Sequence, residues 1–528
     1  MSVSHVPVVI VGAGPTGVTA ATLLAQYGIS CLVLDRWTEV YPQPRAVHLD
    51  DEVYRILARL GVAEEFAAIS RPARGLQLRD NTHAVLAEFT RDTGESRNGY
   101  PQANMFDQPE LEALLRTNLQ RYPHAVLRGN VEVTGIAQDW MGVRVTYADR
   151  TTQSVHTVDA DYVLGCDGAN SITRGTIGSS MRSMRFDQRW LVLDIATAAD
   201  LGQWDGVHQV CDPVRAGTFM QISPVRYRWE FRLLDGETAD DYRTVAALRP
   251  LIAPWLGTVA DHELDLIRVT EYTFRAQLAD RWRTGRIFLL GDSAHLTPPF
   301  IGQGMGAGLR DAMNLTWKLA AVLAGDLPDS ILDSYEQERK PHAQAMIHLA
   351  LLMGAAMTAG GDIGNLLRRL LVPRLQWIPA LHDRVKDSAT PALRRSALVE
   401  DSHWTERLAG PAAHHRLAGT LCPNELLAHG NRLDTDIGRG FALITTDALD
   451  ETHEALVRGR GARVHVAAPT SALFDWLRRG RARAAIVRPD RTVMKAGNDL
   501  DALCTTMPTF HIPEALIPTS KGAHPWRQ

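Results

Sequence analysis

Three glycines close to the start of the chain restrict its fold more than any other feature. Gly12, Gly14 and Gly17 form a G-x-G-x-x-G string that directly follows an apolar run at residues 8–11 and opens a helical pattern at residues 18–27. In a strand–turn–helix unit the first glycine makes the tight turn and the second lets a pyrophosphate approach the backbone. The third lets helix and strand pack closely. The string therefore predicts a dinucleotide site at the end of a buried strand.

A second strand and an acidic residue strengthen this prediction. Residues 31–34 form another short apolar run, which completes a βαβ pattern with parallel strands, and Asp35 follows directly. A carboxylate at this position can accept hydrogen bonds from the ribose of a dinucleotide. We therefore favour a bound dinucleotide over a glycine turn that serves only packing.

Two later strands end in acidic turns. Residues 162–164 lead to Asp167, and residues 286–290 lead to Gly291 and Asp292. Asp292 is placed to hold a polyol chain, although a plain strand-to-loop turn would also use Gly and Asp here. The three turns together are far more specific than any one of them.

A proline-rich loop follows the last of these strands and opens a helix predicted over residues 304–323. The backbone N–H groups at a helix start are free and carry positive partial charge. They suit an isoalloxazine ring, which becomes anionic when it is reduced. The loop therefore favours a flavin over a nicotinamide as the bound dinucleotide.

Between the second and third turns the pattern changes to period two. In residues 226–233 Tyr227 and Trp229 fall on an apolar face, while Arg228 and Glu230 fall on the other face. We interpret residues 185–280 as an inserted antiparallel sheet with a partly polar face that forms a substrate wall.

The composition limits the kinds of partner. The 528 residues carry 56 Lys and Arg against 60 Asp and Glu, a net charge of −4, so nucleic acid is not an expected partner. The longest apolar stretch, residues 347–357, is shorter than the about 20 residues of a membrane-spanning helix. The start of the chain lacks a signal-peptide pattern, and the five cysteines are widely separated. We expect a cytoplasmic protein with buried thiols and without a membrane segment or a metal.

The last part of the chain has a pattern of its own. Beyond about residue 390 the helical patterns weaken and short strands are predicted at residues 441–444, 463–467 and 484–487. A separate C-terminal α/β module is consistent with this change. The predicted domains are 1–184 and 281–390 for dinucleotide binding, 185–280 for the inserted sheet and 391–528 for the C-terminal module.

The three turns, in this order and spacing, resemble the single-component FAD-dependent aromatic hydroxylases, which share the p-hydroxybenzoate hydroxylase fold. The resemblance is closest to the 3-(3-hydroxyphenyl)propionate and 3-hydroxycinnamate hydroxylases. It extends to the segments at residues 44–52, 211–215, 314–319, 335–339 and 487–490. It implies an α/β FAD-binding fold with an inserted antiparallel substrate sheet and a C-terminal thioredoxin-like domain without an active cysteine pair.

The resemblance also implies roles for individual residues. Pro299 would lie over the reactive edge of the flavin, and Asp292 would bind its ribityl chain. Gln102 sits where the family places a polar or basic residue near the cofactor. The residues implied in cofactor binding are Gly12, Gly14, Gly17, Asp35, Arg36, Arg45, Gln102, Asp167, Arg174, Gly291, Asp292, Gly302, Gly304 and Met305.

The implied reaction uses NADH or NADPH as a transient reductant and O2, and it proceeds through a flavin C4a-hydroperoxide that attacks a phenol carbon. Either His48 or His208 could assist as a base, although an isolated histidine is more often structural. If the small aromatic substrate carries a carboxylate, Arg215 is the first candidate to meet it, with Tyr227 as a second substrate contact, and a structural ion pair is the alternative for Arg215.

Several alternatives stay open at this point. A hydroxylase that acts on polyketides or other natural products would share the same fold, and an FAD-binding scaffold without activity is a second alternative. A flavin halogenase is excluded because the W-x-W-x-I-P motif is incomplete around Trp377, and a serine hydrolase is excluded because G-x-S-x-G is missing at Ser293. The oligomeric state, including a homo-oligomer, is open.

Overall fold

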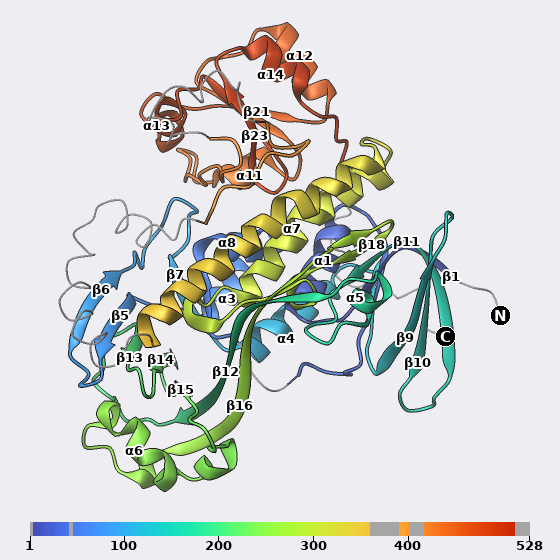
Figure 1. Ribbon diagram of the computed structural model, residues 1–528. Helices are drawn as coiled ribbons and strands as arrows, with labels where there is room; N and C mark the ends of the chain where they lie inside the picture. Colours follow the sequence, from blue (N-terminus) through green and yellow to red (C-terminus); the bar gives the residue numbers. More distant parts are fainter. Residues whose placement is uncertain (1–3, 42–45, 359–389, 401–416, 513–528) are drawn as a thin grey trace.

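The computed structural model describes residues 4–41, 46–358, 390–400 and 417–512. Two large sheets are joined by the long strands β12 (Met181–Ala196) and β16 (Asp265–Ala279), and a further module lies at the C-terminal end (Figure 1). This mixture of parallel sheet, helices and an antiparallel sheet confirms the predicted α/β class.

The first sheet contains the predicted βαβ unit. β1 (Ser4–Val11) pairs in parallel with β2 (Cys31–Leu34) on one side and with β11 (Val155–Gly165) on the other. β18 (Ile287–Leu289) pairs in parallel with β11, so the glycine turn and the two acidic turns leave the same edge of one sheet. The remaining strands are β8 (Ala125–Arg128), β9 (Val131–Gln138), β10 (Val143–Asp149) and β17 (Arg283–Thr284).

The helices that cover this sheet agree with the sequence pattern. α1 (Pro15–Gln26) packs between α4 (Gln108–Leu119) and α7 (Gly304–Leu323), whose bounds are those predicted. α1 begins three residues before its predicted start because a proline is tolerated in the first turn of a helix. α8 (Asp333–Thr358) packs along α7.

Shorter elements connect the two sheets. They include a small sheet in which β7 pairs with β3 and β4, and helices between its strands. Their bounds are β3 His48–Asp50, α2 Asp51–Leu60, α3 Ala63–Ala68, β4 Ser70–Pro72, β7 Ala103–Phe106 and α5 Ile172–Thr176.

The second sheet is the predicted inserted sheet, and it is larger than the insertion. Besides β12 and β16 it contains two strands that precede residue 185, because β13 pairs in parallel with β5. The domain limits at residues 184, 280 and 390 stay predictions. The strands are β5 Gly75–Asp80, β6 Val85–Thr90, β13 Val207–Cys211, β14 Gly217–Ser223, β15 Arg226–Arg232 and β19 His295–Leu296.

Both faces of β15 are buried. The predicted apolar face packs on α6 (Val245–Leu256), with Trp229 against a cluster that includes Trp255. The predicted polar face is also buried, because the Arg228 guanidinium donates to both carboxylate oxygens of Asp194 at 2.7 and 3.0 Å. This pairing lets a charged face form the wall of a cavity rather than face bulk water.

The C-terminal module is a four-stranded mixed sheet with helices, as expected for a thioredoxin-like domain. Its strands follow the order β21, β20, β22, β23, with β20 and β21 parallel and the others antiparallel. The three predicted strands are confirmed within one residue. The bounds are α11 Leu433–Ile437, β20 Ala442–Thr445, α12 Glu451–Gly459, β21 Arg463–Val466, α13 Ala472–Arg479, β22 Ala484–Val487, β23 Val493–Gly497 and α14 Leu500–Thr506.

A buried ion network ties this module to α7 and α8. The Arg488 guanidinium donates to Glu338 at 2.9 Å, and the Lys318 ammonium donates to the same carboxylate at 2.9 Å. The Asn314 amide donates to Glu338 at 2.8 Å. Three segments that the sequence analysis singled out, at residues 314–319, 335–339 and 487–490, therefore meet in one interface.

Candidate active site

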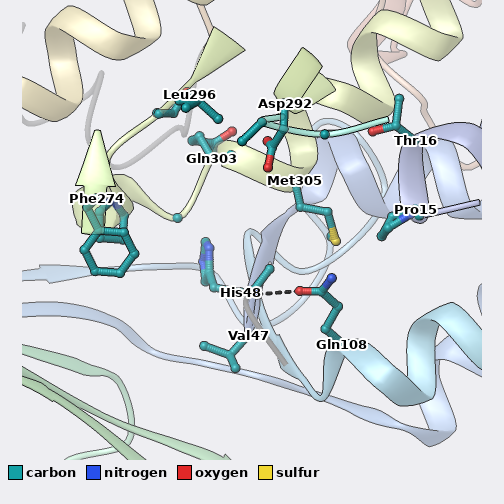
Figure 2. Close-up of a pocket in the computed structure, with 18 of the residues that line it drawn as sticks. Pro15, Thr16, Val47, His48, Gln108, Phe274, Asp292, Leu296, Gln303 and Met305 are labelled. Carbon is teal, nitrogen blue, oxygen red and sulfur yellow. Dashed lines mark hydrogen bonds between the residues drawn. The ribbon is translucent and has the colours of Figure 1, made fainter. Parts of the chain in front are cut away.

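One cavity of about 1680 Å³ runs from the glycine turn of the first sheet to the second sheet. Figure 2 shows side chains from β3, α4, β16 and α7 around it. Arg45 lies outside the described residues. The predicted residues that line the cavity are Gly12, Gly14, Asp35, Arg36, His48, Asp167, Asp292, Pro299, Gly302, Gly304 and Met305.

The glycine turn is closed on one side and open on the other. A Cβ on Gly12 would lie 2.4 Å from the carbonyl oxygen of Cys166, and a Cβ on Gly17 would lie 2.0 Å from the carbonyl oxygen of Gly12. A Cβ on Gly14 would meet no atom within 4 Å. Gly12 and Gly17 are therefore required for packing, whereas Gly14 leaves room for a ligand beside the start of α1.

Asp35 and an arginine from α4 flank this turn. The Asp35 carboxylate accepts hydrogen bonds from the backbone N–H groups of Ala13 at 2.6 Å and Trp37 at 2.7 Å. Arg116 donates to the carbonyl of Ala13 at 3.3 Å, while its buried Nε has no partner among the described residues. Arg116 lines the cavity, so its unpartnered N–H marks a place for an anion. Sequence analysis missed Arg116, which no motif identifies.

Asp167 and Arg174 support the second turn without touching each other. Asp167 accepts from the Ser171 hydroxyl at 2.6 Å and from the Thr173 N–H at 3.0 Å. Arg174 donates to the carbonyls of Ala169 at 2.7 Å and Ser293 at 3.0 Å. Arg174 does not line the cavity, and its two hydrogen bonds connect the turn at Asp167 to the turn at Asp292.

Buried contacts with α1 and α7 hold the third turn, at Gly291 and Asp292, in place. Gly291 adopts the left-handed region with φ +62°, where a Cβ would lie 2.8 Å from the Thr16 hydroxyl oxygen. The Gly291 N–H donates to Asp311 at 3.0 Å, and Asp311 also pairs with His295 at 2.8 Å. These buried contacts hold the turn so that Asp292 projects into the cavity (Figure 2).

The loop at residues 297–303 closes the cavity over the start of α7. The Phe300 ring lies 5.8 Å from Trp190 of β12, centroid to centroid, which fastens the loop to the second sheet. Gln303 precedes α7 but makes no side-chain hydrogen bond to its first turn, because its amide donates to Asp50 at 2.9 Å. The first N–H groups of α7, at Gly304 and Met305, therefore face the cavity as donors.

His48 lies where the loop meets the cavity. A Cβ on Gly302 would lie 2.8 Å from its Nδ1, so this glycine permits the close approach. Burial lowers the pKa of His48 to about 4, although the nearby Asp50 opposes the shift, and the charge of Arg91 adds to it. His48 is therefore neutral at pH 7. In the view of Figure 2 it lies between Phe274 and Met305.

Gln102 is placed elsewhere, and another glutamine lines the cavity. The Gln102 side chain accepts from the backbone N–H of Asp92 at 2.9 Å, outside the lining. Gln108, at the start of α4, lines the cavity, and its side-chain oxygen accepts from the Ala46 N–H at 2.6 Å. This corrects the expectation for Gln102. A polar residue at a helix start directly after the buried strand β7 was the signal that could have identified Gln108.

His208 does not reach the cavity. It is 0% exposed and lies behind the second sheet, where it accepts from the Trp255 indole N–H at 3.2 Å. Its other ring nitrogen lies 3.0 Å from the Trp204 carbonyl oxygen. Burial, followed by the charge of Arg79, lowers its pKa to about 4. The expectation that His208 acts as a base is corrected, because no substrate in the cavity can touch it.

The two predicted substrate contacts also lie outside the cavity lining. Arg215 forms an ion pair with Glu237, with one N–O distance of 2.8 Å, so the structural alternative for this arginine holds. Tyr227 belongs to the apolar face of β15 and stacks on Phe219 at a centroid distance of 6.1 Å. Side-chain alternation places Tyr227 on the face that packs against α6, away from the cavity.

The wall opposite the cofactor loop is formed by the other face of the second sheet. Aromatic and aliphatic side chains form most of this wall, with a few buried polar groups among them. The lining residues from this sheet are Gly75, Leu76, Trp190, Val192, Val207, Gln209, Thr218, Met220, Glu230, Tyr272, Thr273, Phe274, Arg275 and Leu296. A largely apolar wall with a few polar groups is typical of a site for a small organic ligand.

The donors and the open turn fit the FAD implied by the resemblance. Gly14 leaves space for a pyrophosphate, Arg116 offers an unpartnered N–H, and the start of α7 offers backbone donors for the flavin ring. Within the described ranges we find no group of three or more metal-ligating side chains. The same ranges contain no helix long and apolar enough to cross a membrane.

Comparison with known proteins agrees with this geometry. The family described as "FAD binding domain" matches residues 5–350. The chain is 33% identical over 524 residues to a 3-(3-hydroxy-phenyl)propionate/3-hydroxycinnamic acid hydroxylase of Burkholderia vietnamiensis, covering 92% of each chain. It is 38% identical over 354 residues to a probable NADH-specific resorcinol 4-hydroxylase of Rhodococcus jostii, covering 67% of this chain and 66% of that protein.

Solved structures share the fold. The flavin-dependent monooxygenase PieE, in complex with FAD and substrate, superposes with a TM-score of 0.77 at 24% identity, covering 95% of this chain and 98% of that one. Aklavinone-11 hydroxylase superposes with a TM-score of 0.76 at 24% identity, covering 96% and 99%. The chain therefore belongs to the family of FAD-dependent aromatic hydroxylases and is a flavin monooxygenase with FAD as its cofactor.

Proposed function

We propose that the protein hydroxylates a small phenol, with 3-(3-hydroxyphenyl)propionate or 3-hydroxycinnamate as first candidates and the corresponding catechol as product. The balanced reaction consumes the phenol, NADH, a proton and O2, and yields the catechol, NAD+ and water. The observation that carries the proposal is the continuous cavity that connects the glycine turn with the wall of the second sheet. The relatives named as hydroxylases of these two acids support the choice of substrate.

FAD would be held by the residues at the three turns. We propose that Gly12 and Gly14 border its pyrophosphate, that Asp35 binds the adenosine ribose and that Asp292 binds the ribityl chain. Gly17, Gly291, Asp167 and Arg174 would hold the turns in place, while Arg36 and Arg116 would lie beside the adenosine half. When bound, FAD would supply a hydride acceptor for the reduced nicotinamide and the means to activate O2 for transfer of one oxygen atom to the ring.

The surrounding side chains place the ring and exclude water. Pro299 and Phe300 cover the cavity at the start of α7, and Phe274 and Trp190 provide flat apolar contacts for an arene. His48 is neutral at pH 7 and would serve as a hydrogen-bonding partner rather than as a cation. Because Arg215 is engaged by Glu237, we propose Arg91, which lines the cavity near His48, as the partner of a substrate carboxylate.

A second candidate function is hydroxylation of resorcinol. The relative named as an NADH-specific resorcinol 4-hydroxylase favours it, and so do the polar groups on the sheet wall, which suit a second ring hydroxyl. The same relative supports NADH as the reductant.

A substrate panel tests these proposals. Purified protein loaded with FAD is mixed with NADH and, separately, with 3-(3-hydroxyphenyl)propionate, 3-hydroxycinnamate, resorcinol and a bulky anthraquinone, and NADH consumption and product mass are measured. We expect fast consumption with a product heavier by one oxygen atom for the small acids. Coupled turnover of resorcinol alone would favour the second candidate, and turnover of the anthraquinone alone would favour natural-product tailoring. Absence of turnover with every compound would favour an FAD-binding scaffold.

A further inference from the structure

Three polar side chains form a straight row across the wall of the second sheet. Gln209 of β13 lies opposite Thr218 of β14, and Thr218 lies opposite Glu230 of β15. Directly opposed residues in neighbouring antiparallel strands point to the same face of a sheet. All three line the cavity, with exposed fractions of 4%, 7% and 8%, respectively. We name them the acceptor row.

Gln209 connects this row to the loop over the cofactor site. Its Nε2 donates to the carbonyl oxygen of Phe300 at 2.9 Å, which fixes the orientation of the amide. Its Oε1 is buried and has no partner among the described residues. A buried acceptor without a partner is rare in folded proteins, so this oxygen is placed to receive a donor from a ligand.

Glu230 adds a carboxyl group to the same row. The charges that act on it are those of Arg228, Asp194 and Arg268, and burial outweighs the two arginines and raises its pKa. Both arginines form ion pairs with Asp194, at 2.7 Å for Arg228 and 3.1 Å for Arg268. Both arginines are thus paired with Asp194, and Glu230, which lines the cavity opposite Thr218, is the carboxyl group of the row.

The row suits a ring hydroxyl and does not suit a carboxylate. Gln209 Oε1 and an ionised Glu230 only accept hydrogen bonds, and a phenol supplies the matching donor. A substrate carboxylate beside Glu230 would meet a like charge. We infer that the acceptor row binds the phenolic hydroxyl of the substrate and that Glu230 is the catalytic residue that takes its proton. This inference rests on the proposed hydroxylation of a phenol.

The proton transfer is balanced within the site. The phenolic O–H bond breaks, the proton forms a new O–H bond on the Glu230 carboxylate, and the electron pair stays on the phenolate oxygen, which enriches the ring for attack at the neighbouring carbon. The proton returns to the oxygen of the product as the catechol leaves. Hydroxyl groups in positions 1 and 3 of a ring are separated by nearly the distance between neighbouring strands, about 4.8 Å, so the row also matches a second hydroxyl.

The test compares Glu230→Gln with a matched control. Glu271 lies in β16 of the same sheet and does not line the cavity. Glu271→Gln removes a partly exposed ion pair with Arg189. We expect Glu230→Gln to lower kcat for the best phenol by about 10²-fold, the usual lower bound for a positioned general base. We expect it also to abolish the acid-side decrease of kcat with pH. The control is expected to keep kcat and the pH profile of the wild type.

Binding supplies a readout that does not need turnover. Dissociation constants for 3-(3-hydroxyphenyl)propionate and its methyl ether are measured on the FAD-loaded protein, without O2 and NADH, from the change in flavin absorbance. We expect the wild type to prefer the phenol by about tenfold, because the ether leaves the buried acceptors unpaired, and Glu230→Gln to reduce that preference. A preference for the phenol over the ether would support the acceptor row even if the wild type turned over no compound. Absence of turnover would then count against the proposed function alone.

Two results would overturn the inference. One is a Glu230→Gln protein with kcat within threefold of the wild type and an unchanged pH profile. The other is equal binding of phenol and ether by the wild type. If Glu230→Gln does not retain FAD, Thr218→Val takes its place in the binding measurement. This substitution removes one hydroxyl group from the acceptor row and leaves the charges of the site unchanged. An unchanged preference in Thr218→Val would then overturn the proposed row.

Discussion

The cofactor half and the substrate half of the cavity are built from different groups. At the three turns the backbone provides most of the site. Gly12 and Gly17 permit close packing, and backbone N–H groups line the start of α7. On the second sheet the polar groups that line the cavity belong to side chains on one face of the strands, such as Gln209 of β13 and Glu230 of β15. A backbone site needs glycine at fixed spacing, whereas a sheet wall accepts many side chains. The first half therefore leaves a motif in the sequence, and the second half does not.

The strongest test of this comparison sets two glycines against each other. Gly17→Ala would place a Cβ 2.0 Å from a backbone oxygen, so we expect failure to fold or a melting temperature lowered by more than 10 °C, a loss of several kcal/mol. Gly14→Ala meets no protein atom within 4 Å, so we expect a nearly unchanged melting temperature in the FAD-free protein and at least tenfold weaker FAD binding. Thermal unfolding and flavin titration measure both. Equal effects of the two substitutions would contradict the division of roles.

Asp292 is the side chain that matters most in the backbone-built half. It projects into the cavity from the turn that Asp311 supports, so Asp292→Ala should weaken FAD binding by about 10- to 100-fold through loss of charge-assisted hydrogen bonds to the ribityl chain. Equilibrium dialysis of the flavin gives the dissociation constant. Asp292→Asn, which keeps the shape and one acceptor, serves as the control and should have a smaller effect. Retention of FAD at the wild-type level in Asp292→Ala would refute the assignment.

The pH dependence of stability compares His48, which lines the cavity, with His208, which lies behind the second sheet. Burial holds the pKa of His48 and of His208 at about 4, below the unfolded value of about 6.5. Between these values the unfolded chain binds protons that the folded chain does not, so the free energy of unfolding should decrease as the pH falls from about 6.5 to about 4. The expected loss is on the order of 2 kcal/mol per histidine, measured by denaturant unfolding at pH 7 and pH 5. His208→Gln should reduce the loss, and an unchanged slope would contradict the assignment.

Arg215 should show the smallest effect. Its ion pair with Glu237 is partly exposed, so Arg215→Ala should cost about 1 kcal/mol of stability or less. Because Arg215 does not line the cavity, the KM for 3-(3-hydroxyphenyl)propionate should stay within twofold of the wild type. Arg91→Ala provides the contrast, with an expected increase in KM of about tenfold for the acid and little change for resorcinol. A large increase in KM for Arg215→Ala would restore the original expectation for this residue.

The positions of many helices and strands could be predicted from the sequence because the patterns that indicate them are local. The helix at residues 304–323 and the strands of the C-terminal module lie within a residue of their predicted positions. Alternation also separated the two faces of β15 correctly. It could not show that the polar face is buried, because the Asp194 that neutralises Arg228 lies on another strand.

The errors at the candidate site have the same origin. Arg215 looked available because its partner Glu237 lies 22 residues away, beyond the reach of any local pattern. His208 looked like a candidate base until the sheet placed it against Trp255. Gln102 was chosen by its place in a family, while the fold brings Gln108 to the cavity instead. Partners that are far apart along the chain and meet only in the folded structure set the limit of what the sequence could predict.

The helix α7 has one end at the flavin loop and the other in the C-terminal interface. Its first N–H groups face the cavity, and Lys318, four turns further on, is buried against Glu338 together with Arg488. A chain cut after residue 390 would thus leave a carboxylate and an ammonium without the third member of their network, on the same helix that presents donors to the cofactor. The C-terminal module has no active cysteine pair but is joined to the far end of that helix through this network, so its removal should weaken FAD binding as well as expose the interface.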